Sequence, residues 1–345
     1  MIDSKNLDQV LWCNKCDCNF NILIDEKDEN VIIKGHLNCD NCNENHPIID
    51  DIILFDKKIK TKSVKYQSEI YSYWWNESHK TLEYDKNDAK KILLSTLSLE
   101  IEDFKNKIVL DAGCGNGRFS DIVSESDPKI LVIADVSDGI FAAKKKIKDK
   151  NLNLIAIKGD LNQIPFRQKV FDIIYSWGVI HHTPDPKFTF ENISKFCKLN
   201  GKLGIYIYKQ NPEYRYNNMH VRLLAILRQY LIIQPLRFIS QFLSEKNVIR
   251  LFKPIHFIEN FFNYGVVGCH TNFSDNKFEK KHYFRVVIDR FKTKYASEHQ
   301  EHEIISWYKE NEFNDLIIGS NPKIGIIGTK KNNEVKEINV MYKYS

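Results

Sequence analysis

Five short apolar runs in the middle of the chain predict strands that are covered on both faces. They occupy residues 109–112, 131–134, 155–157, 171–175 and 204–208, and longer, more polar stretches separate them. Nearly unbroken apolar runs are typical of parallel strands, because a strand with one solvent-facing side alternates apolar and polar residues. The pattern predicts an α/β fold with a doubly wound, mostly parallel sheet.

The end of the chain completes this sheet. Residues 303–313 have the spacing of an amphipathic helix, and the apolar runs 316–318 and 324–328 predict two further strands. Residues 211–291 show no sheet pattern and combine apolar residues with arginines, so we expect a helical insertion that acts as a lid. Its basic residues favour a solvated helix face, with a phosphate, a carboxylate or an anionic membrane as alternative partners.

A glycine-rich turn follows the first of the five strands. Asp111 ends that strand, and Gly113, Gly115 and Gly117 come after it at alternate positions. Glycine has no Cβ atom, so the backbone can adopt positive φ and approach a ligand closely. A tight connection without a ligand, with the acid as a helix N-cap, is the alternative interpretation. Nicotinamide dehydrogenases also use a related turn.

The order of the later strands distinguishes these alternatives. Asp135 and Asp160 follow the next two apolar runs, and residues 198–208 have the form of a turn and a fifth strand. With these features in order, the chain resembles the class I S-adenosylmethionine (SAM) dependent methyltransferases. The resemblance implies a sheet of seven mostly parallel strands, which 316–318 and 324–328 close as an antiparallel hairpin. A carboxylate at Asp135 can accept hydrogen bonds from both ribose hydroxyls, and the resemblance implies that Asp160 faces the adenine amino group.

The same resemblance assigns the cofactor site to the ends of four strands. The residues expected to contact SAM are Asp111, Gly113, Cys114, Gly115, Gly117, Asp135, Val136, Asp160, Leu161, Ser176 and Trp177.

Four cysteines near the start of the chain have the spacing of a metal site. Cys13 and Cys16 form one Cys-x-x-Cys pair, and Cys39 and Cys42 form another after 22 intervening residues. Two such pairs can close one tetrahedral Zn²⁺ site, and the apolar runs between them predict a hairpin. We expect structural zinc, with Cys18 and His46 as substitute ligands; iron or a labile redox site is the alternative. Disulfides would need an oxidising compartment, which nothing in the sequence indicates.

Residues 46–55, which come after the second pair, resemble the end of the zinc ribbon of the tRNA methyltransferase activator subunit. That family acts as a separate partner that stabilises and activates methyltransferases. In this chain the ribbon is fused to the expected catalytic domain, and an ordinary structural ribbon is the alternative.

These patterns divide the chain into five segments. We expect a zinc ribbon in 1–56, a linker and N-terminal helices in 57–106, the SAM-binding α/β core in 107–210, the helical lid in 211–291 and the end of the core in 292–345. An aromatic cluster in the second segment, at residues 66–75, is expected either to pack between domains or to wall the site.

The composition of the chain changes these predictions little. The chain has 345 residues and a formal net charge of +5, which is too slight to indicate a nucleic-acid partner. It shows no apolar leader and no uncharged run long enough to span a membrane, so we expect a cytoplasmic protein with peripheral membrane contact at most. The oligomeric state stays open.

The chemistry expected at the site is a methyl transfer. His181 and His182 follow the fourth strand, where the acceptor must lie, and a histidine can act as general base toward a hydroxyl. His270, His282 and His299 are other candidates for the base. Capping or loop roles are the alternative for the histidine pair.

The residues after the fourth strand narrow the choice of acceptor. Residues 176–179 contain neither an Asn-Pro-Pro-Tyr-like motif for exocyclic amines nor a cysteine for pyrimidine carbon methylation. The histidine pair resembles the methyltransferase group that includes quinone, sterol and sugar enzymes. We therefore expect a small-molecule or glycan acceptor methylated at oxygen. An RNA-modifying methyltransferase and a non-catalytic SAM-binding assembly protein are the alternatives.

Overall fold

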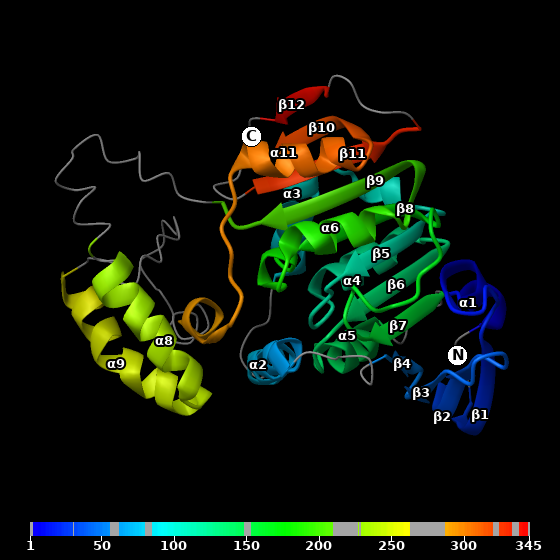
Figure 1. Ribbon diagram of the computed structural model, residues 1–345, viewed down its shortest axis with the longest axis horizontal. Coiled ribbons are helices and arrows are strands. Elements are labelled where there is room, and N and C mark those ends of the chain that lie inside the picture. Colours follow the sequence, from blue (N-terminus) through cyan, green and yellow to red (C-terminus); the bar gives the residue numbers. More distant parts are fainter. Residues whose placement is uncertain are drawn as a thin grey trace. The chain divides into compact units, whose positions relative to one another are not determined.

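The computed structural model describes residues 3–29, 31–55, 62–79, 85–147, 153–209, 227, 229–262, 287–319, 324–332 and 338–343. The chain divides into two compact units (Figure 1). One comprises Met1–Lys209 with Ser297–Ser345, and the other is Gln210–Ala296.

A seven-stranded sheet forms the centre of the first unit and confirms the predicted fold class. Its spatial order is β7-β6-β5-β8-β9-β11-β10, and the first five of these strands pair in parallel. β11 is antiparallel to both β9 and β10, as the predicted closing hairpin requires. The strands are β5 (Ile108–Ala112), β6 (Ile130–Asp135), β7 (Leu154–Lys158), β8 (Phe171–Trp177), β9 (Cys197–Ile207), β10 (Phe313–Gly319) and β11 (Ile324–Lys330).

The sheet is larger than the seven strands expected, because other segments extend both edges. The ribbon contributes β1 (Asn21–Asp28), β2 (Val31–Asn38), β3 (Asn45–Ile49) and β4 (Ile52–Leu54), which continue the sheet from β7. β12 (Val340–Lys343) pairs in parallel with β10 at the other edge, giving twelve strands in the described part of the chain. An exposed strand edge leaves N–H and C=O groups unpaired, and both extensions satisfy such groups.

Helices cover both faces of the central sheet. α1 (Ser4–Val10), α6 (Pro186–Ser194) and α11 (Glu301–Glu310) pack their apolar residues with one set of strand side chains. α3 (Lys86–Leu97), α4 (Arg118–Val123) and α5 (Gly139–Ile147) pack with the other set. Within β5, Ile108 and Leu110 belong to the first apolar cluster and Val109 to the second, as the alternation of side chains along a strand requires.

The helix α2 (Lys62–His79) packs on the loop after β6. The Ser68 hydroxyl donates a hydrogen bond to the Val136 carbonyl over 2.6 Å, and the Asp138 N–H donates to the Ser72 hydroxyl over 2.9 Å. α2 therefore lies at the carboxyl ends of the parallel strands. Short 3₁₀ helices also lie in the described part of this unit: η2 (Ile101–Phe104), η3 (Ser124–Ser126) and η4 (Ile180–His182).

The second unit is helical where the structure describes it. It contains the π-helix η6 (Gln229–Ile233), α8 (Gln234–Phe242), α9 (Glu245–Phe262) and the π-helix η7 (Ile288–Lys292). Its role as a lid stays a prediction, and Arg215, Arg222, Arg228, His270 and His282 lie outside the described residues. None of the described helices is both long and apolar enough to cross a bilayer.

Candidate functional site

The glycine-rich turn after β5 has positive φ at three alternate positions, a conformation that glycine adopts most readily. The φ angles of Gly113, Gly115 and Gly117 are 94°, 54° and 76°. A Cβ atom added at Gly113 would lie 2.4 Å from a Val179 methyl group, and one added at Gly117 would lie 2.7 Å from Cα of Ala143. The turn is thus packed closely from two sides. Its N–H groups at Gly113 and Cys114 donate to the Ala134 carbonyl, and the Gly117 N–H donates to the Cys114 carbonyl.

Asp135 ends β6 beside this turn and is buried. Its carboxylate accepts hydrogen bonds from the Gly115 N–H and the Ser137 N–H, both over 2.8 Å, and from the Ser137 hydroxyl over 2.5 Å. Burial raises the pKa of Asp135, and these three hydrogen bonds oppose the rise. Since a carboxylate has about four acceptor sites, one remains for a ligand hydroxyl. For both ribose hydroxyls to bind Asp135, the Ser137 hydroxyl would have to give up its hydrogen bond to this carboxylate.

Asp111 lies beneath the turn. It is buried, and its carboxyl group accepts hydrogen bonds from the Ser120 hydroxyl over 2.5 Å and the Tyr175 hydroxyl over 2.8 Å. Burial raises the pKa of Asp111 to about 7, although both hydroxyls lower it. These contacts join β5 to α4 and β8, so Asp111 positions the turn from below.

The other expected cofactor residues also lie at the carboxyl ends of β5 to β8. Asp160 follows β7 and accepts a hydrogen bond from the Asn162 N–H over 2.9 Å, while burial raises its pKa. The buried Ser176 hydroxyl donates to the Ala112 carbonyl over 2.8 Å. The Trp177 ring stacks on Tyr206 with a centroid separation of 4.1 Å. Cys114 and Leu161 are buried, and Val136 contacts α2 through its carbonyl.

An aromatic ring from α2 covers the glycine turn. A Cβ atom added at Gly115 would lie 2.3 Å from the Trp75 ring, and one added at Gly139 would lie 2.7 Å from it. Trp75 therefore packs directly on the backbone of both glycines. Trp75 belongs to the aromatic cluster at residues 66–75, and it lies at the glycine turn that is predicted to bind the cofactor.

The predicted histidine pair is buried in an aromatic cluster. His181 is completely buried, and its ring centroid lies 3.8 Å from that of Tyr208 and 4.1 Å from that of His182. His182 retains 6% exposure and lies 5.5 Å from the Tyr71 ring of α2. His182 is thus the member of the pair that faces the helix covering the cofactor edge.

A second histidine system lies next to the pair. His299 Nε2 is 2.7 Å from the Ser297 hydroxyl, and its Nδ1 is 2.9 Å from a Glu303 carboxylate oxygen. The Ser297 N–H donates to the His181 carbonyl over 2.9 Å. Sequence reasoning named His299 and missed Ser297 and Glu303, although the i,i+4 spacing of His299 and Glu303 was a usable signal.

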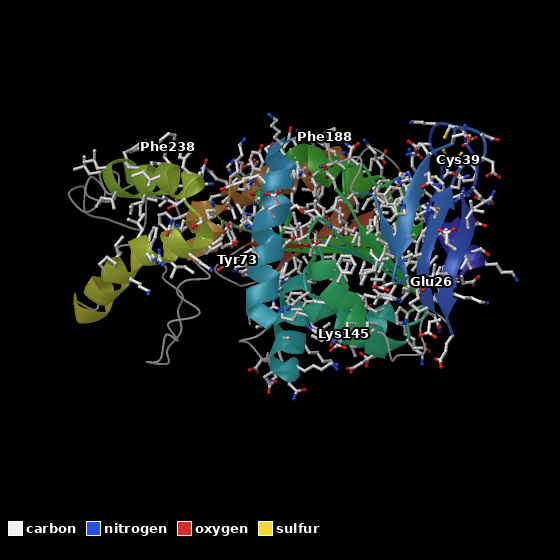
Figure 2. The ribbon with its side chains drawn as sticks, turned by 90° about the horizontal axis from the view of Figure 1, so that it is seen from below. Glu26, Cys39, Tyr73, Lys145, Phe188 and Phe238 are labelled. Atoms are coloured by element: carbon white, nitrogen blue, oxygen red, sulfur yellow. The ribbon has the colours of Figure 1, made fainter. Side chains whose placement is uncertain are left out.

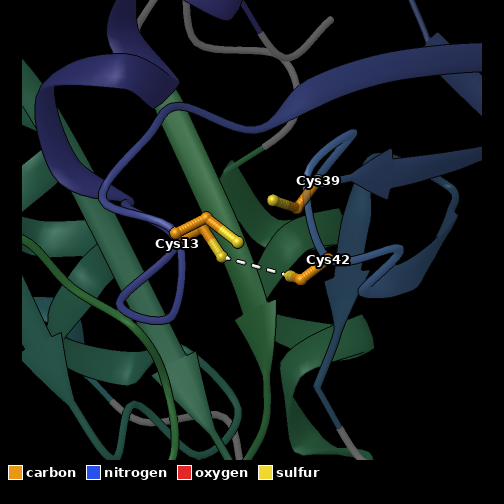
Figure 3. A group of neighbouring side chains, drawn as sticks. Cys13, Cys39 and Cys42 are labelled. Atoms are coloured by element: carbon orange, nitrogen blue, oxygen red, sulfur yellow. Dashed lines mark hydrogen bonds between the residues drawn. The ribbon is translucent and has the colours of Figure 1, made fainter.

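The four cysteines of the predicted metal site come together between two loops of the ribbon (Figure 3). Their Sγ atoms all lie within 4.8 Å of one another, and those of Cys13 and Cys42 are 3.6 Å apart. A tetrahedral zinc ion with Zn–S bonds of about 2.3 Å separates its sulfur ligands by about 3.8 Å. The donor set and its dimensions therefore fit Zn²⁺.

The surroundings of this cluster favour a thiolate. Burial raises the pKa of Cys39, but N–H groups of Cys42 and Asn41 and the neighbouring thiols donate to it, and its pKa is lowered to about 6. The substitute ligands lie outside the group of four. Cys18 Sγ is 3.6 Å from Cys39 Sγ, and the His46 ring packs on Phe55 with a centroid separation of 4.1 Å.

Comparison with known proteins identifies the core of the first unit. Residues 110–205 match the family described as "Methyltransferase domain". These residues form a class I SAM-dependent methyltransferase domain. The match covers the strands that carry the glycine turn, Asp135, Asp160 and the histidine pair.

Two relatives show how far the similarity extends. A sterol 24-C-methyltransferase from Clavispora lusitaniae is 27% identical over 168 residues, which are 46% of this chain and 44% of that protein. A ubiquinone biosynthesis O-methyltransferase from Coxiella burnetii is 26% identical over 151 residues, which are 44% of this chain and 63% of that protein. The chain thus spans 44 to 63% of the length of these two relatives.

Solved structures are similar at a lower level. Magnesium protoporphyrin IX methyltransferase from Synechocystis PCC 6803, solved with bound SAH, is 12% identical, covers 77% of this chain and 97% of its own, and has a TM-score of 0.45. A complex of the Haloferax volcanii Trm112 methyltransferase activator with a methyltransferase is 11% identical. The match covers 76% of this chain and 98% of that chain, with a TM-score of 0.43. Similarity at these values carries no inference about activity.

We expect the group of four cysteines to hold one zinc ion per chain. Replacement Cys39→Ser should remove it and should expose the ribbon to protease, because a segment this short relies on the metal for its stability. Elemental analysis and limited proteolysis measure both effects. Cys18→Ser is the matched control and should keep its zinc; loss of zinc from this variant with retention in Cys16→Ser would assign the fourth ligand to Cys18 instead.

The buried Asp111 predicts a pH dependence of stability. Its pKa is raised from 3.8 to about 7, so between pH 5 and 7 the folded chain holds a proton that the unfolded chain has lost. Stability from this group therefore falls as pH rises, by about 1.4 kcal/mol per pH unit. Urea unfolding of the cofactor-free protein should show this slope relative to Asp111→Asn. Equal slopes for the two proteins would contradict it.

Proposed function

We propose that this chain transfers the methyl group of SAM to an oxygen atom of a small molecule or glycan. The observation that carries the proposal is a juxtaposition at one edge of the sheet. The glycine turn and Asp135 lie at the carboxyl ends of β5 and β6, and His182 follows β8, the strand that pairs with β5. Cofactor residues and a base are thus held on adjacent strands.

The chain's own residues supply the cofactor contacts. The glycines of the turn place no side chain of their own between the backbone and a ligand, Asp135 has an acceptor site for a ribose hydroxyl, and Asp160 stands after β7 for the adenine amino group. SAM, when bound, supplies an electrophilic methyl group. Trp75 packs on Gly115 and Gly139, so its ring must stack on a ligand at this turn or move aside.

His182 is the residue that we assign as general base. A hydroxyl acceptor must lose its proton as its oxygen attacks the methyl carbon, and an imidazole can take that proton near neutral pH. His182 is preferred to His181 because His181 is completely buried between His182 and Tyr208. His181 and Tyr208 would then fix the orientation of the His182 ring.

The names of the two relatives support a small-molecule acceptor rather than RNA, since one acts in ubiquinone biosynthesis and the other is a sterol methyltransferase. The ubiquinone relative is an O-methyltransferase and the sterol relative is a C-methyltransferase, so the choice of oxygen rests on the histidine assigned as base together with the first of these names.

Asp135→Ala should raise the dissociation constant for SAM at least tenfold. The variant loses a charged acceptor, and a hydrogen bond to a charged group contributes about 1.5 to 3 kcal/mol. Titration calorimetry measures the change. Asp25→Ala, at an exposed site on β1, is the control and should bind SAM like the parent protein. Unchanged affinity in Asp135→Ala would remove the assigned cofactor site.

His182→Ala should lower turnover by about 10² to 10⁴ and abolish the ionisation near neutral pH in the rate profile, with SAM affinity retained. The fraction that contains the acceptor is identified first. A labelled methyl group is transferred to an extract, which is then separated into lipid, glycan, small-molecule and RNA fractions. His36→Ala, on β2 of the ribbon, is the control. If His299→Ala alone shows the loss, the base is the His299–Glu303 pair.

The transfer assay also decides between the alternatives. Label in the RNA fraction would replace the proposed acceptor class. SAM binding with no transfer to any fraction would favour a non-catalytic assembly protein.

A further inference from the structure

The Gln210–Ala296 unit exposes an unusual concentration of large apolar side chains. In the described residues, fifteen large apolar side chains are exposed, and seven of these lie within residues 227–242. They are Leu227, Tyr230, Leu231, Ile232, Phe238, Ile239 and Phe242. Phe242 is 75% exposed and Leu231 69%, values more typical of lysine than of a core residue. We call these seven residues the apolar face.

The apolar face does not belong to the core of its own unit. Ile233 at the end of η6 and Ser240 of α8 are both buried, and Arg237 between them donates to the Thr293 and Lys294 carbonyls. The core of the unit is built elsewhere, where Phe252 packs on Phe291 with a centroid separation of 4.6 Å. The opposite side of α8 therefore carries the exposed residues.

Two phenylalanines give this side a compact centre. Phe238, labelled in Figure 2, and Phe242 lie one helical turn apart, and their ring centroids are 5.0 Å apart. Their exposed fractions are 65% and 75%. An exposed aromatic pair on an amphipathic helix is suited to the boundary between lipid headgroups and acyl chains.

The charge of the unit is as uneven as its apolar surface. Residues 210–296 contain fourteen Lys and Arg against six Asp and Glu, a formal net charge of +8, whereas the whole chain carries +5. Lys246, Arg250 and Lys253 are exposed on α9 at positions i, i+4 and i+7, which lie on one side of a helix. The rest of the chain is net negative, so the positive charge is concentrated in this unit.

We propose that the Gln210–Ala296 unit binds the surface of an anionic lipid bilayer through the apolar face. Phe238 and Phe242 enter the boundary between headgroups and acyl chains, and the basic residues of α9 attract the anionic headgroups. The absence of a membrane-spanning helix in the described residues agrees with a peripheral contact. A second copy of the unit is disfavoured as the occupant, because two units that each carry a formal net charge of +8 repel each other.

The test uses the full chain and sedimentation with unilamellar vesicles. One set is phosphatidylglycerol and phosphatidylcholine in equal parts, and the other is phosphatidylcholine alone. The parent protein should bind the anionic set and bind it less as salt is raised. The double variant Phe238→Ser and Phe242→Ser should bind at least tenfold more weakly, because two aromatic side chains no longer leave water.

Matched variants separate the apolar and electrostatic parts of the interaction. Phe188→Ser, at a 50% exposed position on α6, should leave vesicle binding unchanged. Lys246→Gln with Arg250→Gln should weaken binding to the anionic vesicles while keeping the thermal melting temperature of the parent protein. The double phenylalanine variant should keep that melting temperature as well, since both side chains are exposed.

Three outcomes would overturn the proposal. The parent protein could fail to bind anionic vesicles, or bind them only as tightly as the phenylalanine variant does. A concentration-dependent dimer that this variant abolishes would identify the apolar face as an interface between copies. The assay requires neither SAM nor turnover, so its failure and a failure of the proposed methyl transfer are distinguishable.

Discussion

The pairing of β4 with β7 ties the parts of the first unit together. β7 would otherwise be the open edge of a parallel sheet, and β4 pairs with it over Ile52↔Ala156, Ile53↔Ile157 and Leu54↔Lys158. The Phe55 N–H extends the pairing by donating to the Lys158 carbonyl over 2.7 Å. One run of backbone hydrogen bonds thus attaches the ribbon with the four cysteines to the methyltransferase core and supports the strand that precedes Asp160.

This pairing also brings the candidate metal site and the proposed cofactor site into one framework. Phe55 is completely buried, packs on His46 of the ribbon and lies against Gly159, the residue before Asp160. The ribbon is therefore more than an appended module, because its apolar residues belong to the same core cluster as those of the central strands. A family that works as a separate activator subunit resembles this ribbon in sequence, and here the corresponding segment extends one edge of the central sheet.

The electrostatics at the carboxyl edge depend on the burial of two carboxyl groups. Burial raises the pKa of both Asp111 and Asp135, and the charge of Asp135 adds to the rise at Asp111. Their hydrogen-bond partners are hydroxyl and backbone N–H groups. A cationic ligand such as SAM would stabilise the ionised carboxylates, so cofactor binding and carboxylate ionisation should favour each other.

The sequence alone determined the features that short-range physics encodes. Apolar runs predicted the strands, the alternate glycines marked the turn at Gly113 to Gly117, and the spacing of four cysteines indicated the metal site, because strand burial, positive φ and ligand spacing are local properties. Only the tertiary structure decided that β4 pairs with β7, that Trp75 packs on Gly115 and that His299 joins Ser297 and Glu303 beside His181. The apolar face of the second unit likewise became apparent only from its burial pattern. These contacts join segments whose patterns fit several partners equally well, and the choice among partners is made by the packing of the whole chain.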